Sequence, residues 1–282
     1  MAHPRPRISC STGTFYHLPL ERSLALIRDA GYDGAEFAVS PESLARTTTA
    51  IERIVRRVGL PILSYHPPLY PFPGWPRNQK AGMLAVVEGA RALGAEVAVI
   101  HAPKGYSLTT PRALQYVAGI TAAREQAALY DVVIGFETTQ CAHDGKPAML
   151  FDDLTLFLDF ARQHDLSVTF DTAHAGANGE DLVAVLERIG PRLRNIHLSD
   201  CRMETSRDGR PQPKTHLIPG DGNTGDIPAF LAALGSSGYG GLITLEVSPF
   251  ALGLWPPATL SQRLIAMREY VEQRLAATAI AL

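Results

Sequence analysis

The stretch Val168-Thr169-Phe170-Asp171-Thr172-Ala173-His174 joins a run of apolar residues to an acid and a histidine near the middle of the chain. A short apolar run of this kind is typical of a buried strand, which would stop at Asp171. Similar runs end on His66, His101, Glu137, His197 and Glu246. Six such endings at roughly regular intervals predict one polar site, assembled from the ends of several strands.

Segments with helical apolar spacing lie between these runs. We expect strands at residues 8–12, 34–39, 62–65, 96–100, 132–136, 166–170, 193–196 and 242–245, and helices at 20–30, 40–58, 78–93, 111–130, 150–164, 181–189, 227–234 and 260–275. Strands and helices in strict alternation require a parallel sheet, and eight strands are the number that closes into a barrel. We therefore predict an α/β fold, a single (β/α)8 TIM barrel domain over residues 1–282.

An open doubly wound sheet is the alternative architecture. Such a sheet carries a glycine-rich phosphate-binding turn after its first strand, and Ser11-Thr12-Gly13-Thr14 does not match that pattern. Two segments lack periodicity. We interpret residues 67–76, with Tyr70, Phe72 and Trp75 among prolines, as a rigid loop at the barrel rim or a lid over a pocket. Residues 200–224 are expected to form a polar loop.

The composition is that of an ordinary globular protein, with 46% hydrophobic and 19% charged residues. A net charge of −2 gives no general attraction to nucleic acid or to an anionic membrane. Three cysteines in a chain of this length fit a reducing compartment. The chain starts without an apolar signal core and has no uncharged run that could span a bilayer, so we expect a cytoplasmic protein without a membrane partner.

In a parallel barrel the carboxyl ends of all strands face one rim. Residues far apart in the sequence would therefore converge there: His66, His101, Glu137, Asp171, His197 and Glu246 from strands, and His174 and His216 from the loops beyond. A single residue of this kind is usually a helix cap or a hydrogen-bonded rim residue. Many carboxylates and imidazoles in one cavity, however, need a cation to compensate them. Mixed nitrogen and oxygen ligands predict a divalent metal, with Zn, Mn, Mg, Fe and Co all left open.

Four pieces of the sequence resemble the xylose-isomerase-like barrel superfamily, which contains endonuclease IV-type enzymes (AP endonuclease family 2) and sugar isomerases and epimerases. They are Asp171-Thr172-Ala173-His174, Asn195-Ile196-His197-Leu198-Ser199-Asp200, His216-Leu217-Ile218-Pro219-Gly220-Asp221-Gly222 and Leu245-Glu246. The resemblance runs from the first strand to the last helix. It implies that Glu137, Asp171, His197 and Glu246 bind one catalytic divalent metal, and that Glu137 and Glu246 are also the acid/base pair.

The resemblance further implies an isomerase or epimerase, or a related dehydratase, acting on a small sugar, sugar phosphate or polyol-derived keto substrate. With a divalent metal at a substrate carbonyl, the adjacent C–H becomes acidic enough for a glutamate to remove its proton. Two alternatives stay open. One is a zinc phosphodiesterase of the endonuclease IV type, with His66 and His101 beside Glu137 at a first metal, and His174 and His216 at a third. The other is a barrel that binds a sugar or a metal without catalysis.

Two features speak against the phosphodiesterase. Lys214 stands where that branch has an aspartate ligand, and a cation opposes metal binding. Residues 40–43 are also too short a connection to carry an arginine into a DNA groove, and Arg53, Arg56 and Arg57 fit the solvated face of a helix. Nucleic acid is therefore not the expected partner, and a homo-oligomer is left open.

Basic residues near the rim are the candidate substrate contacts. We interpret Lys104, His174, Arg202 and Lys214 as side chains that could bind a phosphate, carboxylate or sugar hydroxyl. The alternative for Lys104 and for residues 200–214 is an exposed position in solvent. The walls of the pocket carry no motif that would identify the substrate.

Overall fold

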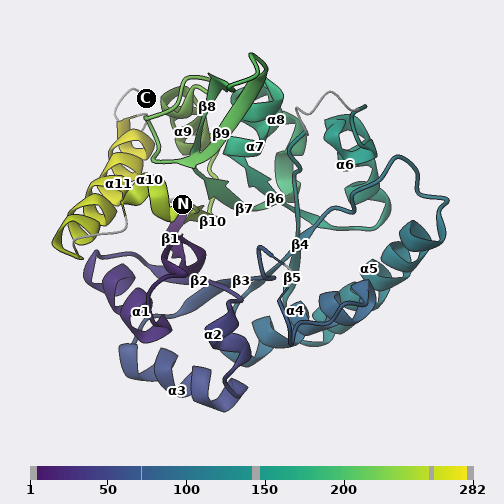
Figure 1. Cartoon of the computed structure of the whole chain (residues 1–282), viewed down its shortest axis with the longest axis horizontal. Helices are drawn as coiled ribbons and strands as arrows, with labels where there is room; N and C mark the ends of the chain where they lie inside the picture. Colours follow the sequence, from purple (N-terminus) through teal and green to yellow (C-terminus); the bar gives the residue numbers. More distant parts are fainter. Residues whose placement is uncertain (1–4, 71, 142–146, 254–256, 278–282) are drawn as a thin grey trace.

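Eight parallel strands form a closed barrel in this computed structural model, which describes residues 5–70, 72–141, 147–253 and 257–277 (Figure 1). Around the barrel the strands follow the order β1-β10-β7-β6-β5-β4-β3-β2. Their bounds are β1 Arg7–Ser11, β2 Gly34–Ala38, β3 Ile62–His66, β4 Val97–His101, β5 Val133–Glu137, β6 Ser167–Asp171, β7 Leu193–Leu198 and β10 Leu242–Leu245. The predicted (β/α)8 barrel is confirmed, and the open sheet is excluded.

Helices lie between the strands and cover the outside of the barrel (Figure 1). They are α1 Leu20–Asp29, α2 Pro41–Leu44, α3 Thr48–Val58, α4 Gln79–Leu93, α5 Pro111–Leu129, α6 Leu154–Gln163, α7 Thr172–Asn178, α8 Leu182–Ile189, α9 Ile227–Ser236, α10 Pro249–Leu252 and α11 Pro257–Ala277. Gly59 and Gly94 end α3 and α4 with φ angles of 75° and 71°, which glycine adopts without strain. Within the described ranges, no helix combines the length and apolar character needed to cross a membrane.

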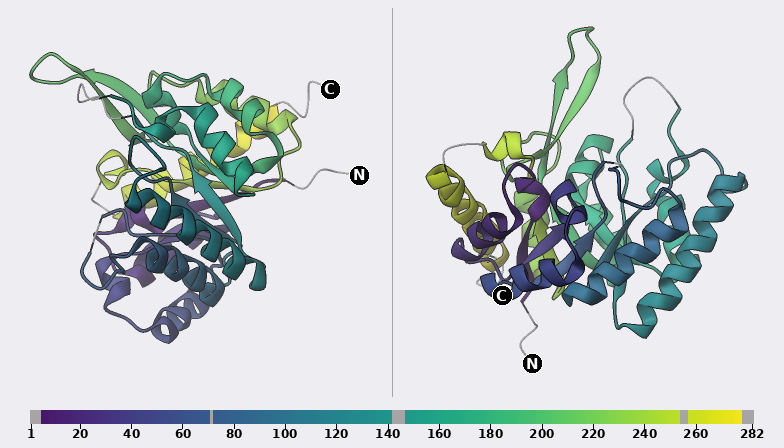
Figure 2. Two further views of the ribbon diagram at one scale, coloured as in Figure 1. Left: turned by 90° about the vertical axis from the view of Figure 1, so that its right-hand side faces the viewer. Right: turned by 60° about the horizontal axis from the view of Figure 1, so that its bottom comes forward.

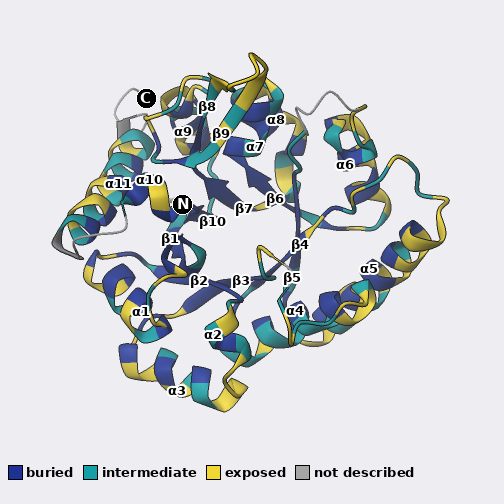
Figure 3. Cartoon of the chain, in the orientation of Figure 1, coloured by how far each residue is buried: buried dark blue, intermediate teal, exposed yellow. Residues whose placement is uncertain are grey.

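The main core lies between the strands and the surrounding helices, where the barrel strands are almost wholly buried (Figure 3). Phe136 of β5 stacks on Phe157 of α6 with ring centroids 4.4 Å apart. Inside the barrel, buried hydroxyl and amide groups pair across strands: Thr244 Oγ1 lies 2.8 Å from Ser9 Oγ and donates to Asn195 Oδ1 at 2.9 Å. These buried polar contacts link β1, β10 and β7.

Two predicted helices are corrected by the structure. The helix expected at 40–58 is two helices, α2 and α3, because Thr47 accepts a hydrogen bond from the Ala50 amide and starts a new helix after a short break. The helix expected at 150–164 begins as a separate 3-10 turn, Leu150–Asp152. Asp153 then caps α6 by accepting from two backbone amides. In both places a capping side chain divides a pattern that periodicity alone joined.

The loop expected at 200–224 is also wrong, because most of it forms an antiparallel hairpin of β8 (Asp200–Thr205) and β9 (Pro211–Leu217). The hairpin follows the carboxyl end of β7 and projects well beyond the barrel (Figure 2). Its outer part is exposed on both faces, so it lacks the apolar alternation by which strands are recognised in a sequence.

Candidate metal centre

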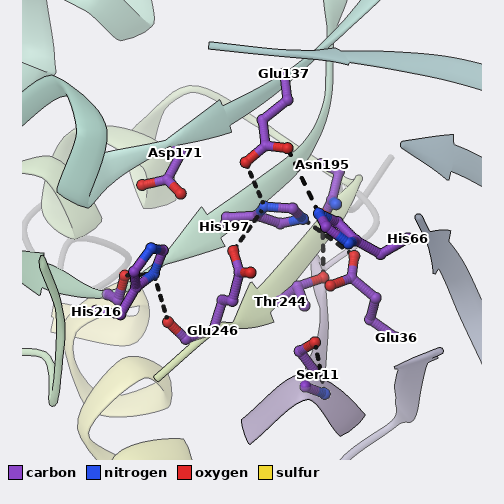
Figure 4. Close-up of polar contacts among 12 residues, drawn as sticks. Ser11, Glu36, His66, Glu137, Asp171, Asn195, His197, His216, Thr244 and Glu246 are labelled. Atoms are coloured by element: carbon purple, nitrogen blue, oxygen red, sulfur yellow. Dashed lines mark hydrogen bonds and ion pairs between the residues drawn. The ribbon is translucent and has the colours of Figure 1, made fainter. Parts of the chain in front are cut away.

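The eight residues predicted as ligands come together at the carboxyl rim of the barrel (Figure 4 draws six of them by name). Four of them are the last residues of consecutive strands β3 to β6: His66, His101, Glu137 and Asp171. His197 lies one residue before the end of β7, and Glu246 directly follows β10. The strand endings thus bring side chains together as the sequence predicts.

His197 is at the centre of this cluster and is completely buried. Its Nδ1 atom lies 2.9 Å from Glu246 Oε2 and 3.2 Å from Glu137 Oε1. Its Nε2 atom lies 3.0 Å from Glu36 Oε2 (Figure 4). Burial opposes a charge on the imidazole, but these three carboxylates hold the pKa of His197 well above its usual value. The three carboxylates therefore favour a positive charge on the imidazole itself.

Glu36 is a buried member of the site that the sequence analysis missed. It is the third residue of β2, in the middle of the strand, and its Oε2 atom also accepts a hydrogen bond from Ser64 Oγ at 2.9 Å. The predicted ligands lie at strand ends, whereas Glu36 reaches the site from within a strand. The signal was present as a single charged residue in Gly34-Ala35-Glu36-Phe37-Ala38, because a carboxylate in a buried strand needs a partner.

Glu137, Asp171, His197 and Glu246 each offer a ligand atom, and these four atoms all lie within 4.8 Å of one another. Asp171 uses Oδ1 to accept from the His174 amide at the start of α7. Its Oδ2 atom is buried at 3.4 Å from His174 Nδ1 and has no hydrogen-bond partner among the described residues. Three carboxylates against one imidazole, with one oxygen unpaired, fit a divalent cation.

The two glutamates of this set are held as carboxylates. Burial would raise the pKa of Glu137, but His101 and His197 bring it well below its usual value. Burial would likewise raise the pKa of Glu246, and His197 lowers it instead. Both side chains therefore carry the charge that a metal ligand or a general base requires.

His66 and His101 lie beside the same glutamate. His101 Nε2 is 2.9 Å from Glu137 Oε2 and 2.9 Å from His66 Nε2. Burial alone would lower the pKa of His66, but Glu137, assisted by more distant carboxylates, raises it to about 9. His66, Glu137 and His197 form a second group of possible ligands that shares two members with the first.

Asp171, His174 and His216 form a third group. His174 belongs to α7, and its ring centroid lies 5.6 Å from that of His216. His216, in β9, has a φ angle of 55°, a left-handed conformation that is uncommon for a residue with a side chain. The hairpin that the sequence analysis missed thus delivers His216 to the site in a strained backbone conformation.

The predicted substrate contacts fall into two places. Lys104 and His174 line a cavity of about 430 Å³ next to the cluster, together with His101 and Glu137. Arg202 and Lys214 belong to the hairpin, where they make other contacts: Arg202 donates to the backbone oxygen of Asp221, and Lys214 Nζ lies 3.7 Å from Glu204 Oε1. Lys214 therefore pairs with an exposed acid of the hairpin.

The chain is similar to known proteins in its sequence and in its fold. The chain is 28% identical over 262 residues to the uncharacterized protein Rv0498 of Mycobacterium tuberculosis, covering 87% of this chain and 90% of that protein. It is 29% identical over 121 residues to an inosose dehydratase of Mesomycoplasma hyopneumoniae, which is 40% of each chain. The solved structure of an L-ribulose 3-epimerase superposes with a TM-score of 0.74 at 16% identity, covering 98% of this chain and 96% of the other.

A family profile described as xylose isomerase-like TIM barrel matches residues 24–270. This match spans most of the barrel, from α1 into α11, and includes all the strand endings that form the cluster. The chain therefore belongs to the xylose isomerase-like TIM barrel family.

Proposed function

We propose that this protein is a divalent-metal-dependent isomerase, epimerase or dehydratase that moves a proton on a small sugar or polyol-derived keto substrate. The observation that carries the proposal is the position of His197 Nδ1, which lies within 3.2 Å of a carboxylate oxygen from Glu137 and within 2.9 Å of one from Glu246. The similarity to proteins named as an inosose dehydratase and an L-ribulose 3-epimerase supports a sugar-like substrate.

The ligands would be Glu137, Asp171, His197 and Glu246, and a bound divalent metal would supply Lewis-acid polarisation of a substrate carbonyl. The two glutamates come from strands that β6 and β7 separate in the barrel. They approach the cluster from different directions, so they can address opposite faces of one substrate carbon. One glutamate, as a carboxylate, would remove the proton from the carbon next to the carbonyl. The other would first take up a proton from solvent and deliver it to the opposite face, and the first would then release its proton to solvent.

Glu36 acts as a positioning residue in this proposal. Because its carboxylate would accept from His197 Nε2, the imidazole would keep its proton on Nε2 when Nδ1 holds the metal, and Nδ1 is directed toward Glu137 and Glu246. Carboxylates that bond to a ligating histidine in this way fix its tautomer and raise its basicity. Ser64 in turn donates to Glu36 and fixes the carboxylate.

Proton exchange tests the proposal directly. The protein, loaded with Mn²⁺ or Mg²⁺, is incubated in D2O with a panel of ketopentoses, ketohexoses and inososes, and NMR follows deuterium entering the carbon next to the carbonyl. We expect exchange in the wild-type protein and at least a roughly 100-fold loss in Glu246→Gln, because a general base is removed. Glu204→Gln, at an exposed glutamate of the hairpin, is the matched control. Undiminished exchange in Glu246→Gln would contradict the assigned role.

A zinc phosphodiesterase is the second candidate, and the group of Asp171, His174 and His216 is the observation that favours it. Lys214 pairs with Glu204 on the hairpin, so its charge is directed to another acid and opposes this group less than the sequence implies. Counting metals separates the two functions. Three tightly bound zinc ions per chain, with cleavage of an abasic-site oligonucleotide or a small phosphodiester, favour the hydrolase, whereas one exchangeable metal favours the isomerase.

A further inference from the structure

A second cavity, of about 380 Å³, opens between the segments that follow β1, β2 and β3. These segments leave the carboxyl ends of their strands, so the cavity lies on the same side of the barrel as the metal centre. Its walls are largely aromatic and aliphatic: Phe15, Leu18, Val39, Leu69, Tyr70 and Phe72. This composition differs sharply from the carboxylates and imidazoles of the metal centre.

Four polar side chains in the wall already bond to the protein: Thr12, Ser23, Ser40 and Glu42. Thr12 and Ser40 each accept a hydrogen bond from a backbone amide, at 2.9 and 3.3 Å. Ser23 donates to a backbone carbonyl, and Glu42 accepts from a backbone amide at 2.8 Å and pairs with Arg46. A sugar hydroxyl would compete with these bonds, whereas an apolar group would find unoccupied apolar walls. The cavity therefore suits an apolar ligand group.

Large apolar side chains stay exposed in the lining of this cavity. Tyr16 is 56% exposed, Leu69 47% and Tyr70 68%. Aromatic side chains that stand together and face solvent at a concave site commonly mark a place where a ligand is bound. A ligand that covered them would gain the free energy of removing this apolar surface from water.

Leu69 connects this cavity to the metal centre, because its side chain lines both the apolar cavity and the cavity that holds His101, Glu137 and His174. Gly13 lies at the same place: a Cβ atom on it would be 3.6 Å from Leu69 Cδ1 and 3.3 Å from Ala38 Cβ. The absence of a side chain at Gly13 keeps this junction from being filled. One ligand could therefore have a polar part at the metal centre and an apolar part beside Leu69.

We propose that the apolar cavity binds an aromatic or alkyl substituent of the substrate, so that the substrate is a substituted keto sugar, such as an aryl or alkyl glycoside that carries a keto group on its ring, and not a free sugar. This inference rests on the proposed function, because it places the sugar part at the metal centre. The two parts of the substrate differ in chemistry: the polar part is held where carboxylates and imidazoles converge, and the apolar part where the walls are largely aromatic and aliphatic.

Paired ligands test the inference by binding alone. Phenyl and methyl β-D-glycosides of glucose, galactose and xylose are titrated calorimetrically into the Mn²⁺-loaded protein. For at least one sugar, the phenyl glycoside is expected to bind about ten-fold more tightly than the methyl glycoside, because the ring is buried in the cavity. Saturation-transfer NMR should show the strongest contacts at the phenyl protons. Equal binding of the two members of each pair, or no binding at millimolar concentration, would overturn the inference.

Variants of the cavity lining test whether the preference for the phenyl glycoside arises in this cavity. In Tyr16→Ser/Tyr70→Ser the ratio of the two affinities should fall toward one, because two walls of the cavity are removed. The matched control is Leu129→Ser, which changes an 81% exposed leucine at the end of α5, outside the cavity lining, and should keep the wild-type ratio. All three sites of change are exposed, and circular dichroism verifies that both variants fold. A ratio that stays at the wild-type value in the double variant would also overturn the inference.

Two further outcomes are decisive. In the first, sedimentation shows that the wild type and Leu129→Ser are dimers and the double variant is a monomer, and no phenyl preference exists. The exposed aromatic side chains then form an interface between copies of the chain, and the inference fails. If the phenyl preference exists but neither the free keto sugars nor phenyl glycosides that carry a ring keto group exchange a proton, the cavity assignment stands and the proposed function fails. If a proton is exchanged but no phenyl preference exists, the proposed function stands and the cavity assignment fails. The two failures are therefore distinguishable.

Discussion

The candidate metal centre and the β8–β9 hairpin are both rich in charged residues, but they hold their charges in opposite ways. Around His197, three carboxylates approach one imidazole, and Glu36 and His197 are completely buried. On the hairpin, the side chains of Lys214 and Glu204 are 58% and 46% exposed and lie 3.7 Å apart. Removing one member of a buried charged set leaves its partners uncompensated, whereas solvent replaces a lost exposed partner. The same residue types should therefore respond very differently to substitution.

The largest effect is expected for Asp171→Asn. This change keeps the size of the side chain but removes a charge from the four-residue ligand set, so we expect the affinity for Mn²⁺ to fall by more than about 100-fold. Calorimetric titration of the metal measures it. Asp208→Asn, at an exposed aspartate of the hairpin, is the control and should bind the metal as the wild type does. Equal affinities in the two variants would remove Asp171 from the ligand set.

Glu36→Gln should have the next largest effect, although Glu36 is not in the proposed ligand set. The amide can still accept from His197 Nε2, but it no longer supplies the negative charge that raises the basicity of the imidazole. We expect a loss of metal affinity of about 10-fold, and about 100-fold in Glu36→Leu, where the hydrogen bond is lost as well. The absorption spectrum of bound Co²⁺ should shift in the leucine variant. A spectrum and an affinity unchanged in both variants would assign Glu36 a purely structural role.

A bound metal should also stabilise the fold, because it compensates the carboxylates around His197. At a metal concentration 100 times the Kd, we expect the free energy of unfolding to rise by about 2.7 kcal/mol. Thermal melts with Mn²⁺ and with a chelator measure this difference. The same pair of melts on Asp171→Asn should coincide at that concentration. A wild-type Tm that is independent of metal would show that the cluster is stable without a cation.

The barrel, and the convergence of the polar residues at its rim, could be predicted because both follow from strand endings. An apolar run that stops at His, Glu or Asp marks a strand and its carboxyl end, and the parallel barrel then brings those ends together. Asp171, His197 and Glu246 are found in this way. The β2 residue Glu36 is not, because it lies in the middle of its strand, where no strand ending marks it.

The hairpin and the apolar cavity could not be predicted for a different reason. Strands β8 and β9 have no consistently buried face, so their sequence carries no period-two apolar pattern. The cavity is formed by three segments that are distant in the sequence, following β1, β2 and β3. Residues 67–76 were interpreted as a rim loop or a lid, and Leu69, Tyr70 and Phe72 in fact line this cavity. Only the three-dimensional structure shows what these segments enclose.

The smallest effect is expected for the exposed pair of the hairpin. Lys214→Ala should change the free energy of unfolding by less than about 0.5 kcal/mol, and the double-mutant cycle with Glu204→Ala should give a coupling of similar size. Urea denaturation of the three variants measures both quantities. The affinity for substrate is a second readout of Lys214→Ala, because the sequence also makes Lys214 a candidate substrate contact.

If Lys214→Ala lowers the affinity for substrate while leaving stability unchanged, the lysine leaves Glu204 and reaches the site when substrate binds. If neither the affinity for substrate nor the stability changes, the hairpin delivers His216 to the candidate metal centre, and its own charges serve only its solubility.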